Sequence, residues 1–424
     1  MNNNPNQPKE YDAVLGGIAP FAPSQGAILG GMQGVKHRFA SSNIEARTAA
    51  LSEALNYGEE GLNLVIGALE DKFRKVRHVA AQLLQQREEI QAKLALQNYK
   101  FWSGFERLNG LPLPYGHART FANRKIIEVD SLPHRISDLT KTAYALRAPY
   151  QRRTVNPDGT TIFINKFESL LQARRANQIE ALVFGFCGYE LDSIVDALVS
   201  ASKYLKSIKA LFIGDIDDVE CDFTWRGITN ISKVIAAYPN LEILKIRCPE
   251  YVFSLLSFAP IQHNKLKALI IESDKLRPKT INEICTLELP ALEYLELWLG
   301  REGGQVWEKY SSFEHLMPII SGQRFPKLKS LGLRHIEDSI YVALALVESP
   351  LIEQLIELDL SMGDLEDEGA EILLNCPSVH QLDSLNLSTN YLSREMIARL
   401  KQLDVEVIID NFDYHGCRYC TASE

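Results

Sequence analysis

The chain lacks the segments that mark a secreted or membrane-spanning protein. Its first ten residues, MNNNPNQPKE, contain no apolar signal segment, and nowhere do about 18 apolar residues follow one another without a charge. The seven cysteines are an odd number spread over 424 residues, so we expect no disulfide framework. These absences predict a chain that stays in the reducing cytoplasm.

The chain also lacks the short motifs of common enzymes. No GxxxxGK[ST], GxGxxG, HExxH, GxSxG or EF-hand pattern occurs in it. We therefore predict no cofactor and no catalytic residues, and we expect a protein that is not an enzyme.

The C-terminal tail holds the nearest approach to a metal site. His415, Cys417 and Cys420 supply three soft ligands within six residues. A tetrahedral zinc site needs a fourth ligand, for which Asp410 and Asp413 are poor candidates, and no second CxxC pair occurs. We predict no metal here.

Charge is distributed unevenly along the chain. Residues 1–178 contain 23 Lys and Arg against 16 Asp and Glu, or +7, which leaves 22 against 38, or −16, for residues 179–424. Such a division is typical of two structural units with different surfaces. The acidic part would repel phosphate backbones, so nucleic acid is not the expected partner.

What the sequence does have is a repeat. The pattern apolar-x-x-apolar-x-apolar occurs eight times, with starts 29, 33, 25, 26, 36, 27 and 27 residues apart, which is in or near the range of leucine-rich repeats. The copies are Ile179-Leu182-Phe184, Ile208-Leu211-Ile213, Leu241-Leu244-Ile246, Leu266-Leu269-Ile271, Leu292-Leu295-Leu297, Leu328-Leu331-Leu333, Leu355-Leu358-Leu360 and Leu382-Leu385-Leu387, and Val405-Ile408-Asp410 resembles a decayed ninth.

Each copy predicts one short strand, and the residues after it have helical spacing. One strand and one helix cannot close a core, so neighbouring copies must stack. We therefore predict an α/β solenoid, a leucine-rich-repeat arc with one strand and one helix per unit. Asn390 stands where the chain leaves the strand, and a small polar side chain there can satisfy freed backbone groups.

The remaining segments are assigned from composition and spacing. Residues 1–35, rich in Gly, Pro, Asn and Gln, predict a flexible leader, and residues 36–98 a small all-α HEAT-like segment with Asn43 as a helix N-cap. In that segment Arg47 and Arg77 each precede paired alanines, as in stacked helix pairs. Residues 99–178 predict a connector and N-terminal cap, in which 162–175 forms a strand and a helix. The solenoid then occupies 179–410 and a tail 411–424.

Side chains alternate across a strand, so the residues beside each core apolar pair should face away from the core. Trp298 stands out among them as an exposed tryptophan between charges, with Tyr294 beside it, a composition typical of interface hot spots. The two longest repeats each contain a further tryptophan after the strand. The predicted binding residues of the inner face and its rim are Lys245, Arg247, Glu272, Tyr294, Glu296, Trp298, Arg334, Asp359, Trp225 and Trp307.

Other charged clusters have plainer explanations. Asp215, Asp217, Asp218, Glu220 and Asp222 lack the calcium-loop ligand order, so we expect a solvated loop. The acidic residues of DLEDEGAE at 364–371 suit a helix N-terminus.

Two parts of the sequence resemble known families. From LFIGDI at 211–216 through YPNLEILKIR, LPALEYLELWLG and FPKLKSLGLR to LNLSTNYLS, the chain resembles a bacterial leucine-rich-repeat family described as molybdate-metabolism-regulator-like, which accompanies WGR-domain proteins. DAVLGG, GGMQGVKHRF and AALSEALNYGEEGLNLVIGALED resemble a HEAT-like leader found ahead of repeat domains in photosynthetic bacteria. The resemblances imply repeat folds and no particular enzymatic activity.

We therefore predict a non-catalytic scaffold that binds another protein through the concave sheet and edge loops of the arc. The alternative is a HEAT-like lyase, or another enzyme-associated protein that handles a small molecule or chromophore. It would need an acid or nucleophile in a pocket, and the helical segment holds no cysteine and only two histidines, His37 and His78.

Overall fold

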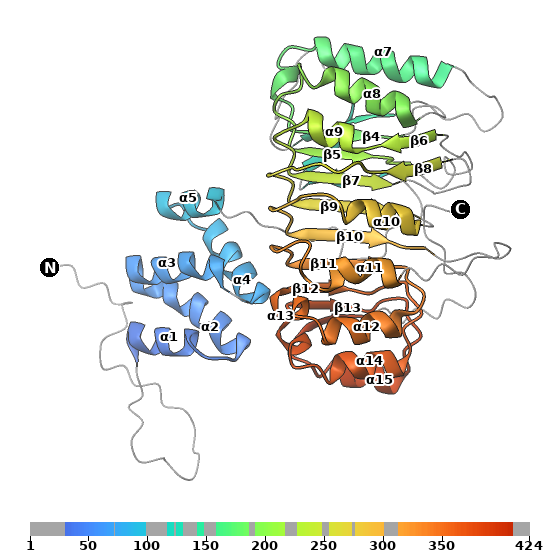
Figure 1. The fold of residues 1–424 in the computed structure, drawn as a ribbon. Helices are drawn as coiled ribbons and strands as arrows, with labels where there is room; N and C mark the ends of the chain where they lie inside the picture. The colour runs from blue at the N-terminus through green and yellow to red at the C-terminus, as the bar shows by residue number, and fades with distance from the viewer. Residues whose placement is uncertain are drawn as a thin grey trace. The chain divides into compact units, whose positions relative to one another are not determined.

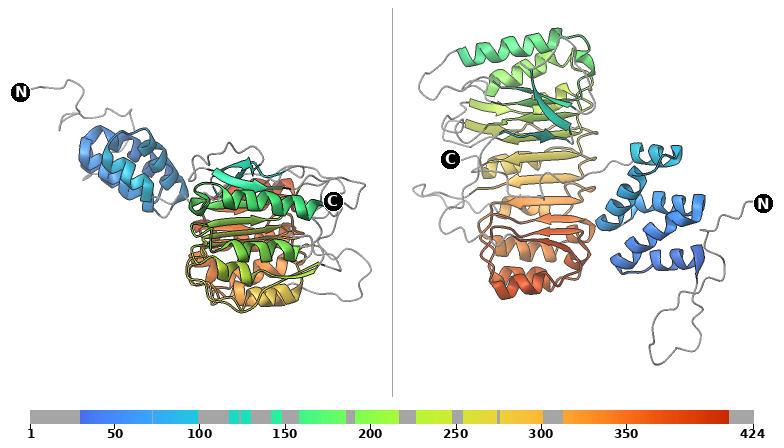
Figure 2. Two further views of the ribbon diagram at one scale, coloured as in Figure 1. Left: turned by 90° about the horizontal axis from the view of Figure 1, so that it is seen from above. Right: turned by 180° about the vertical axis from the view of Figure 1, so that it is seen from behind.

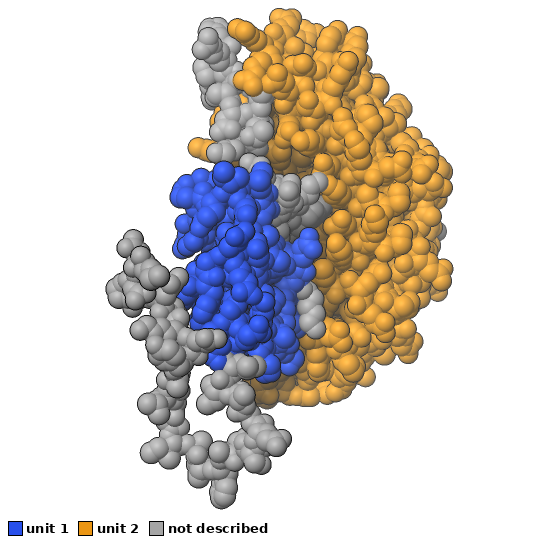
Figure 3. All heavy atoms as spheres, turned by 90° about the vertical axis from the view of Figure 1, so that its left-hand side faces the viewer, with its two compact units in different colours: residues 1–105 blue, residues 106–424 orange. Residues whose placement is uncertain are grey.

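The computed structural model divides the chain into two compact units, residues 1–105 and 106–424 (Figure 3). The structure describes residues 30–71, 73–98, 117–122, 124–129, 142–147, 158–185, 191–216, 227–247, 254–273, 276–300 and 313–409. Each unit has a hydrophobic core of its own.

Unit 1 is built from helices. They are α1 (Gly31–Phe39), α2 (Ile44–Ala54), α3 (Gly58–Gly67), α4 (Arg74–Gln85) and α5 (Ile90–Asn98). Asn43 caps α2 as predicted, because its side chain accepts a hydrogen bond from the Ala46 amide at 2.9 Å. The first helix begins at Gly31, within the segment that we expected to be a flexible leader.

The two arginines that precede the alanine pairs converge on Asp71. Arg47 forms an ion pair with the Asp71 carboxylate, and Arg77 donates to the Asp71 backbone oxygen at 2.7 Å. Ala50 and Ala80 are buried in the core between these helices. Gly61 lies so close to α2 that an added Cβ would be 1.7 Å from the Ala54 carbonyl oxygen. Small residues therefore set the helix spacing in unit 1.

Unit 2 is a solenoid in which one large sheet carries a layer of helices along its outer side (Figures 1 and 2). The sheet has the order β1-β2-β3-β4-β5-β7-β9-β10-β11-β12-β13-β14, parallel except between β1 and β2, and β6 and β8 form a separate parallel pair. The strands are β1 (Thr120–Phe121), β2 (Arg124–Glu128), β3 (Thr142–Leu146), β4 (Ala181–Phe184), β5 (Ala210–Ile213), β6 (Gly227–Asn230), β7 (Ile243–Arg247), β8 (Ser254–Ser257), β9 (Ala268–Glu272), β10 (Tyr294–Trp298), β11 (Ser330–Arg334), β12 (Glu357–Asp359), β13 (Ser384–Asn386) and β14 (Glu406–Ile408).

Helices follow most of the strands and cover their outer side. They are α7 (Asp158–Gln172), α8 (Leu191–Ala201), α9 (Ser232–Ala237), α10 (Pro278–Ile284), α11 (Phe313–Ile320), α12 (Ser339–Val347), α13 (Leu351–Gln354), α14 (Asp367–Leu374) and α15 (Arg394–Leu400). The expected strand near the start of 162–175 is wrong, because α7 runs through it. Among the described residues, no helix is long and apolar enough to cross a membrane.

The register of the sheet confirms the repeat. The second apolar residue of every copy pairs with its counterpart in the next copy, from Leu182 to Leu385: Leu182↔Leu211↔Leu244↔Leu269↔Leu295↔Leu331↔Leu358↔Leu385. All of these leucines are buried in one core between the sheet and the helices. The α/β solenoid expected from spacing alone is therefore the fold.

The sheet continues past both ends of the eight copies. Ile127 pairs with Tyr144, and Tyr144 with Leu182, so β2 and β3 add two parallel strands within the segment expected to be a connector and cap. At the other end Leu385 pairs with Val407 rather than Ile408. The ninth unit therefore exists, but the register assigned to it from sequence was wrong by one residue.

Candidate binding site

The inner face of the sheet carries the residues that the sequence pointed to. Leu295 and Leu297 of β10 face the helices, whereas Trp298 lies in a separate small cluster with Met362 on the other side of the sheet. Alternation along the strands therefore assigned the correct face. Polar side chains form a network across it, in one group on β7 and β9 and a second group from β10 to β13.

Glu272 is the first centre of this network. Its carboxylate lies 2.7 Å from the ammonium of Lys245 and 2.7 Å from Nε of Arg247, both on β7. Burial raises the pKa of the Glu272 carboxyl, but the two cations outweigh burial and hold the pKa at about 2. Lys245 and Arg247 also lie over the ring of Phe212 on β5, at 4.7 and 5.6 Å. The carboxylate is therefore charged and fixed between two strands.

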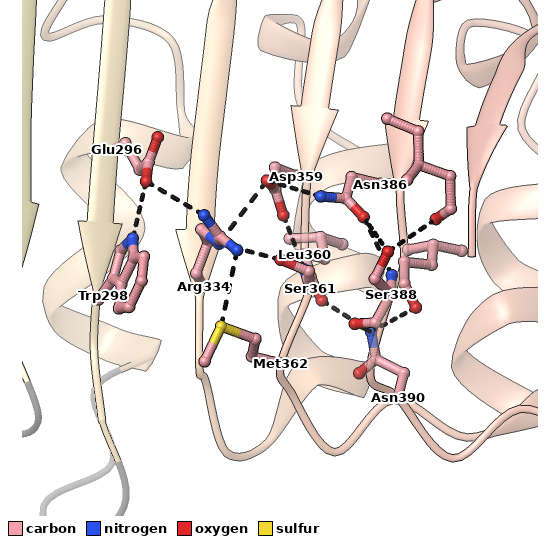
Figure 4. Close-up of polar contacts among 12 residues, drawn as sticks. Glu296, Trp298, Arg334, Asp359, Leu360, Ser361, Met362, Asn386, Ser388 and Asn390 are labelled. Atoms are coloured by element: carbon pink, nitrogen blue, oxygen red, sulfur yellow. Dashed lines mark hydrogen bonds and ion pairs between the residues drawn. The ribbon is translucent and has the colours of Figure 1, made fainter. Parts of the chain in front are cut away.

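Glu296 is the second centre (Figure 4). Trp298 Nε1 donates to Glu296 Oε1 at 2.7 Å. The Tyr294 hydroxyl donates to Oε2 of the same carboxylate. Arg334 on β11 reaches Glu296 Oε1 at 3.4 Å. One buried carboxylate thus accepts from three neighbouring side chains.

Arg334 joins this centre to the next strands (Figure 4). Its Nε donates to Ser361 Oγ at 3.0 Å and lies 3.7 Å from Asp359 Oδ2. Burial alone would lower the pKa of the Arg334 guanidinium, but the carboxylates of Asp359, Glu296 and Glu272 raise it. Gly332 lies beside this group, where a Cβ would approach Glu296 Cγ to 3.1 Å. The glycine leaves room for the Glu296 side chain.

The network ends in hydrogen bonds on β12 and β13. Asn386 Nδ2 donates to Asp359 Oδ2 at 3.0 Å. Asp359 and Asn386 each also accept from the amide two residues further on, those of Ser361 and Ser388. Asp359 and Asn386 therefore satisfy one another and the amides that follow them.

Side chains from a following repeat complete the turns of the repeat before it. Asn390 donates to the Leu360 carbonyl at 2.9 Å and accepts from the Leu365 amide at 3.0 Å, which confirms its predicted backbone role. Asp364 accepts from the amides of Asp338 and Ser339, both at 2.9 Å, at the start of α12. These two turns are thus held from their C-terminal neighbours.

The expectation that Trp298 is exposed is wrong. Its side chain is only 1% exposed, because the Arg334 guanidinium lies 4.6 Å from its ring centroid and Met362 packs beside it. Arg334 itself is buried at 3% exposure, and Glu272, Tyr294, Glu296 and Asp359 are buried with it. Lys245 and Arg247 keep a partly exposed side chain, at 19% and 12%. The network is therefore mainly an internal one.

The first strands of the inner face are apolar instead. Phe121 of β1 packs on Phe212, with ring centroids 5.6 Å apart, in a cluster with alanines of β3, β4 and β5. Beside it Arg147 forms ion pairs with Asp215 and Glu128. The expectation of a solvated loop at Asp215 is wrong, since this residue is fully buried, and an added Cβ on Gly185 would meet Arg147 Cγ at 2.4 Å.

Sequence reasoning missed Arg147, whose partner is 68 residues away. The signal in the sequence was Gly185, which follows β4 and has no side chain to block the long side chain of Arg147. Trp225 and Trp307, like the tail residues His415, Cys417 and Cys420, lie outside the described residues. In the part of the chain that is described, no group of three His, Cys, Asp or Glu side chains could hold a metal ion.

Comparison with known proteins finds similar solved structures. A scan of protein-family models finds no match, and neither does a search of curated proteins. A crystal structure of a protein from Bacteroides fragilis is similar, with 28% identity, a TM-score of 0.54, and coverage of 65% of this chain and 76% of that one.

Two leucine-rich-repeat proteins match more weakly. An internalin from Listeria monocytogenes is 12% identical, with a TM-score of 0.26, and covers 58% of this chain and 84% of its own. A leucine-rich-repeat protein from Leptospira interrogans is 12% identical, with a TM-score of 0.16, over 57% of this chain and 94% of its own. Scores this low support no argument about this chain.

Proposed function

We propose that this chain is a non-catalytic scaffold that binds another protein through its solenoid. The observation that carries the proposal is the unbroken in-register sheet from β2 to β14, whose repeats stack on one continuous core. Such a frame presents an extended rigid surface to a partner. The resemblance to bacterial leucine-rich-repeat and HEAT-like proteins is consistent with a binding role.

The inner-face residues named from sequence keep a place in this proposal with altered roles. Glu272, Tyr294, Glu296, Trp298, Arg334 and Asp359 fix the strands relative to one another through the buried network. Lys245 and Arg247 retain exposed surface and are the inner-face residues best placed to touch a partner. Trp225 and Trp307 stay proposed rim contacts.

The small-molecule alternative gains no support from the described residues. His37 is exposed on α1, the buried acid of unit 1, Asp71, is paired with Arg47, and the described part of unit 1 contains no cysteine. A lyase would need an acid or nucleophile set into a pocket. The proposal therefore stays with protein binding.

Affinity capture with the full chain, followed by cross-linking and mass spectrometry, tests the proposal. We expect one protein to be retained in stoichiometric amount, with cross-links to lysines of residues 106–424. The control bait is Leu295→Asp, which places a charge in the core and should lose the partner. Capture of nothing, or of the same protein by the disrupted bait, would contradict a scaffold role.

A further inference from the structure

The outer surface formed by α11, α12 and α14 carries exposed apolar side chains where a solvated helix layer should be polar. Tyr341 and Leu344 are 54% and 40% exposed, and Met317 of α11 is 40% exposed. Phe313 of α11 packs against Tyr341 with ring centroids 6.1 Å apart. The three helices are consecutive in the layer, and α12 contacts both of the others (Figure 1).

Helix α12 has no polar outer stripe. Its nine residues, SIYVALALV, contain no charge. The buried side is formed by Val342, Ala343 and Leu346, and the outward side by Tyr341 and Leu344, three residues apart on one face. A helix that is apolar on every side is normally covered. Its outward face is therefore a candidate contact surface.

The charged side chains that α11, α12 and α14 themselves supply around this apolar surface are acidic. Residues 335–393 contain twelve Asp and Glu and no Lys or Arg over 59 positions. Helix α11 also has no Lys or Arg. Glu314 on α11, Glu348 at the end of α12 and Glu368 on α14 are all exposed. The surface therefore has an apolar centre bordered by acidic side chains.

The flanking helices show that this pattern is local. Lys279 on α10 lies 3.9 Å from Glu283, and Arg399 on α15 donates to Glu371 at 2.8 Å. Cations in these neighbouring repeats thus face acids, whereas α11 and α12 supply none. A partner that covers the surface would need to supply the cations.

We infer that this outer surface, defined by Met317, Tyr341, Leu344, Glu314, Glu348 and Glu368, binds a basic amphipathic helix of another protein. Leucine-type side chains on one face would cover Tyr341 and Leu344, and flanking Lys or Arg would meet the glutamates. Nucleic acid and anionic membrane are disfavoured because both would face like charge. A second copy seated on the same face would also bring acid against acid. The inference rests on the proposed function and names the chemistry of its partner.

The test uses the full chain and fluorescently labelled peptides of equal length. One is an amphipathic helix of leucine and lysine, the second replaces lysine by glutamate, and the third replaces leucine by serine but keeps the lysines. We expect fluorescence anisotropy near physiological ionic strength to show the leucine–lysine helix binding about tenfold or more tightly than the other two.

Variants localise the binding. Tyr341→Ser with Leu344→Ser should weaken the leucine–lysine helix about tenfold or more, while the matched control Tyr204→Ser, at another exposed tyrosine, should not change it. Glu314→Lys with Glu348→Lys should reverse the preference toward the leucine–glutamate helix. Thermal melting of each variant establishes that it is folded.

Three results would overturn the inference. The serine–lysine peptide could bind as tightly as the leucine–lysine helix, the Tyr341 and Leu344 double variant could bind as the natural chain does, or size-exclusion chromatography could show self-association that this variant abolishes. If the full chain still captures a protein partner in these cases, the scaffold proposal stands and only the surface is wrong. If it captures none, the scaffold proposal itself fails.

Discussion

The guanidinium carbon of Arg334 lies 4.6 Å from the ring centroid of Trp298, on the neighbouring strand. The two residues are direct partners in the register of β10 and β11. A cation over a desolvated indole contributes about 2 kcal/mol or more. This pair and the Glu296 carboxylate between the strands make the inner face part of the fold's interior.

Truncation of the tryptophan should therefore be costly. We expect Trp298→Ala to lower the free energy of unfolding by about 3 to 5 kcal/mol, because it empties a buried ring volume and removes a hydrogen bond to Glu296. Urea denaturation measures the change, and Trp298→Phe should recover part of it. An unchanged unfolding curve would instead support the exposed Trp298 side chain that was predicted from the sequence.

Acid should weaken the fold through Glu272. Its folded-state pKa of about 2 lies below the ordinary value of 4.5, so the charged form stabilises the fold above pH 4.5. That contribution, about 3 kcal/mol, is lost as the pH falls from 4.5 toward 2.

The comparison is urea unfolding of the natural chain and of Glu272→Gln at several pH values. The variant should be less stable at neutral pH, and the difference should shrink as the medium becomes acidic. Glu348→Gln, at an exposed carboxylate, serves as the control. A difference between the natural chain and the Gln variant that is constant with pH would show that Glu272 is not held charged by Lys245 and Arg247.

Two glycines of α3 should respond oppositely to alanine. Gly61→Ala places a methyl group 1.7 Å from the Ala54 carbonyl oxygen, so α2 and α3 must separate and unit 1 should lose stability. Gly67→Ala meets no atom within 4 Å and should gain about 0.5 to 1 kcal/mol from helix propensity. Amide hydrogen exchange of α2 and α3 measures both effects. Equal responses would show that the helices are not in close contact at Gly61.

The repeat leucines should behave as core residues. Leu385 is fully buried and in register with Leu358 and Val407, so we expect Leu385→Ala to cost about 2 to 5 kcal/mol. Chemical denaturation gives the value. A loss below half a kcal/mol is incompatible with this register.

Spacing predicted most of the solenoid because each leucine acts locally. The pattern missed β2 and β3 since Arg124 and Lys141 stand where the first apolar residue of a copy is expected, although Ile127 and Tyr144 keep the second position. It gave the wrong register to β14 for a related reason: Asp404 occupies the first position there. A charged residue at the strand entrance was enough to hide a copy.

Burial on the inner face was harder to predict because it depends on partners far along the chain. Trp298 is covered by Arg334 from the next repeat, and Asp215 is paired with Arg147 two repeats earlier. Alternation gives the side of the sheet to which a residue points, but it does not give the size and charge of its neighbours. The inner face was therefore identified correctly and its exposure incorrectly.

The turns completed by Asn390 and Asp364 each depend on the repeat that follows in the chain. The Asn390 side chain bonds the backbone of Leu360 and Leu365, and the Asp364 side chain bonds the amides of Asp338 and Ser339. In both cases the side chain lies later in the chain than the backbone groups that it satisfies. A ribosome that has released residues only as far as 375 has produced a repeat whose turn amides still lack their partner. Closure of these two turns must then wait for the next repeat to emerge from the ribosome.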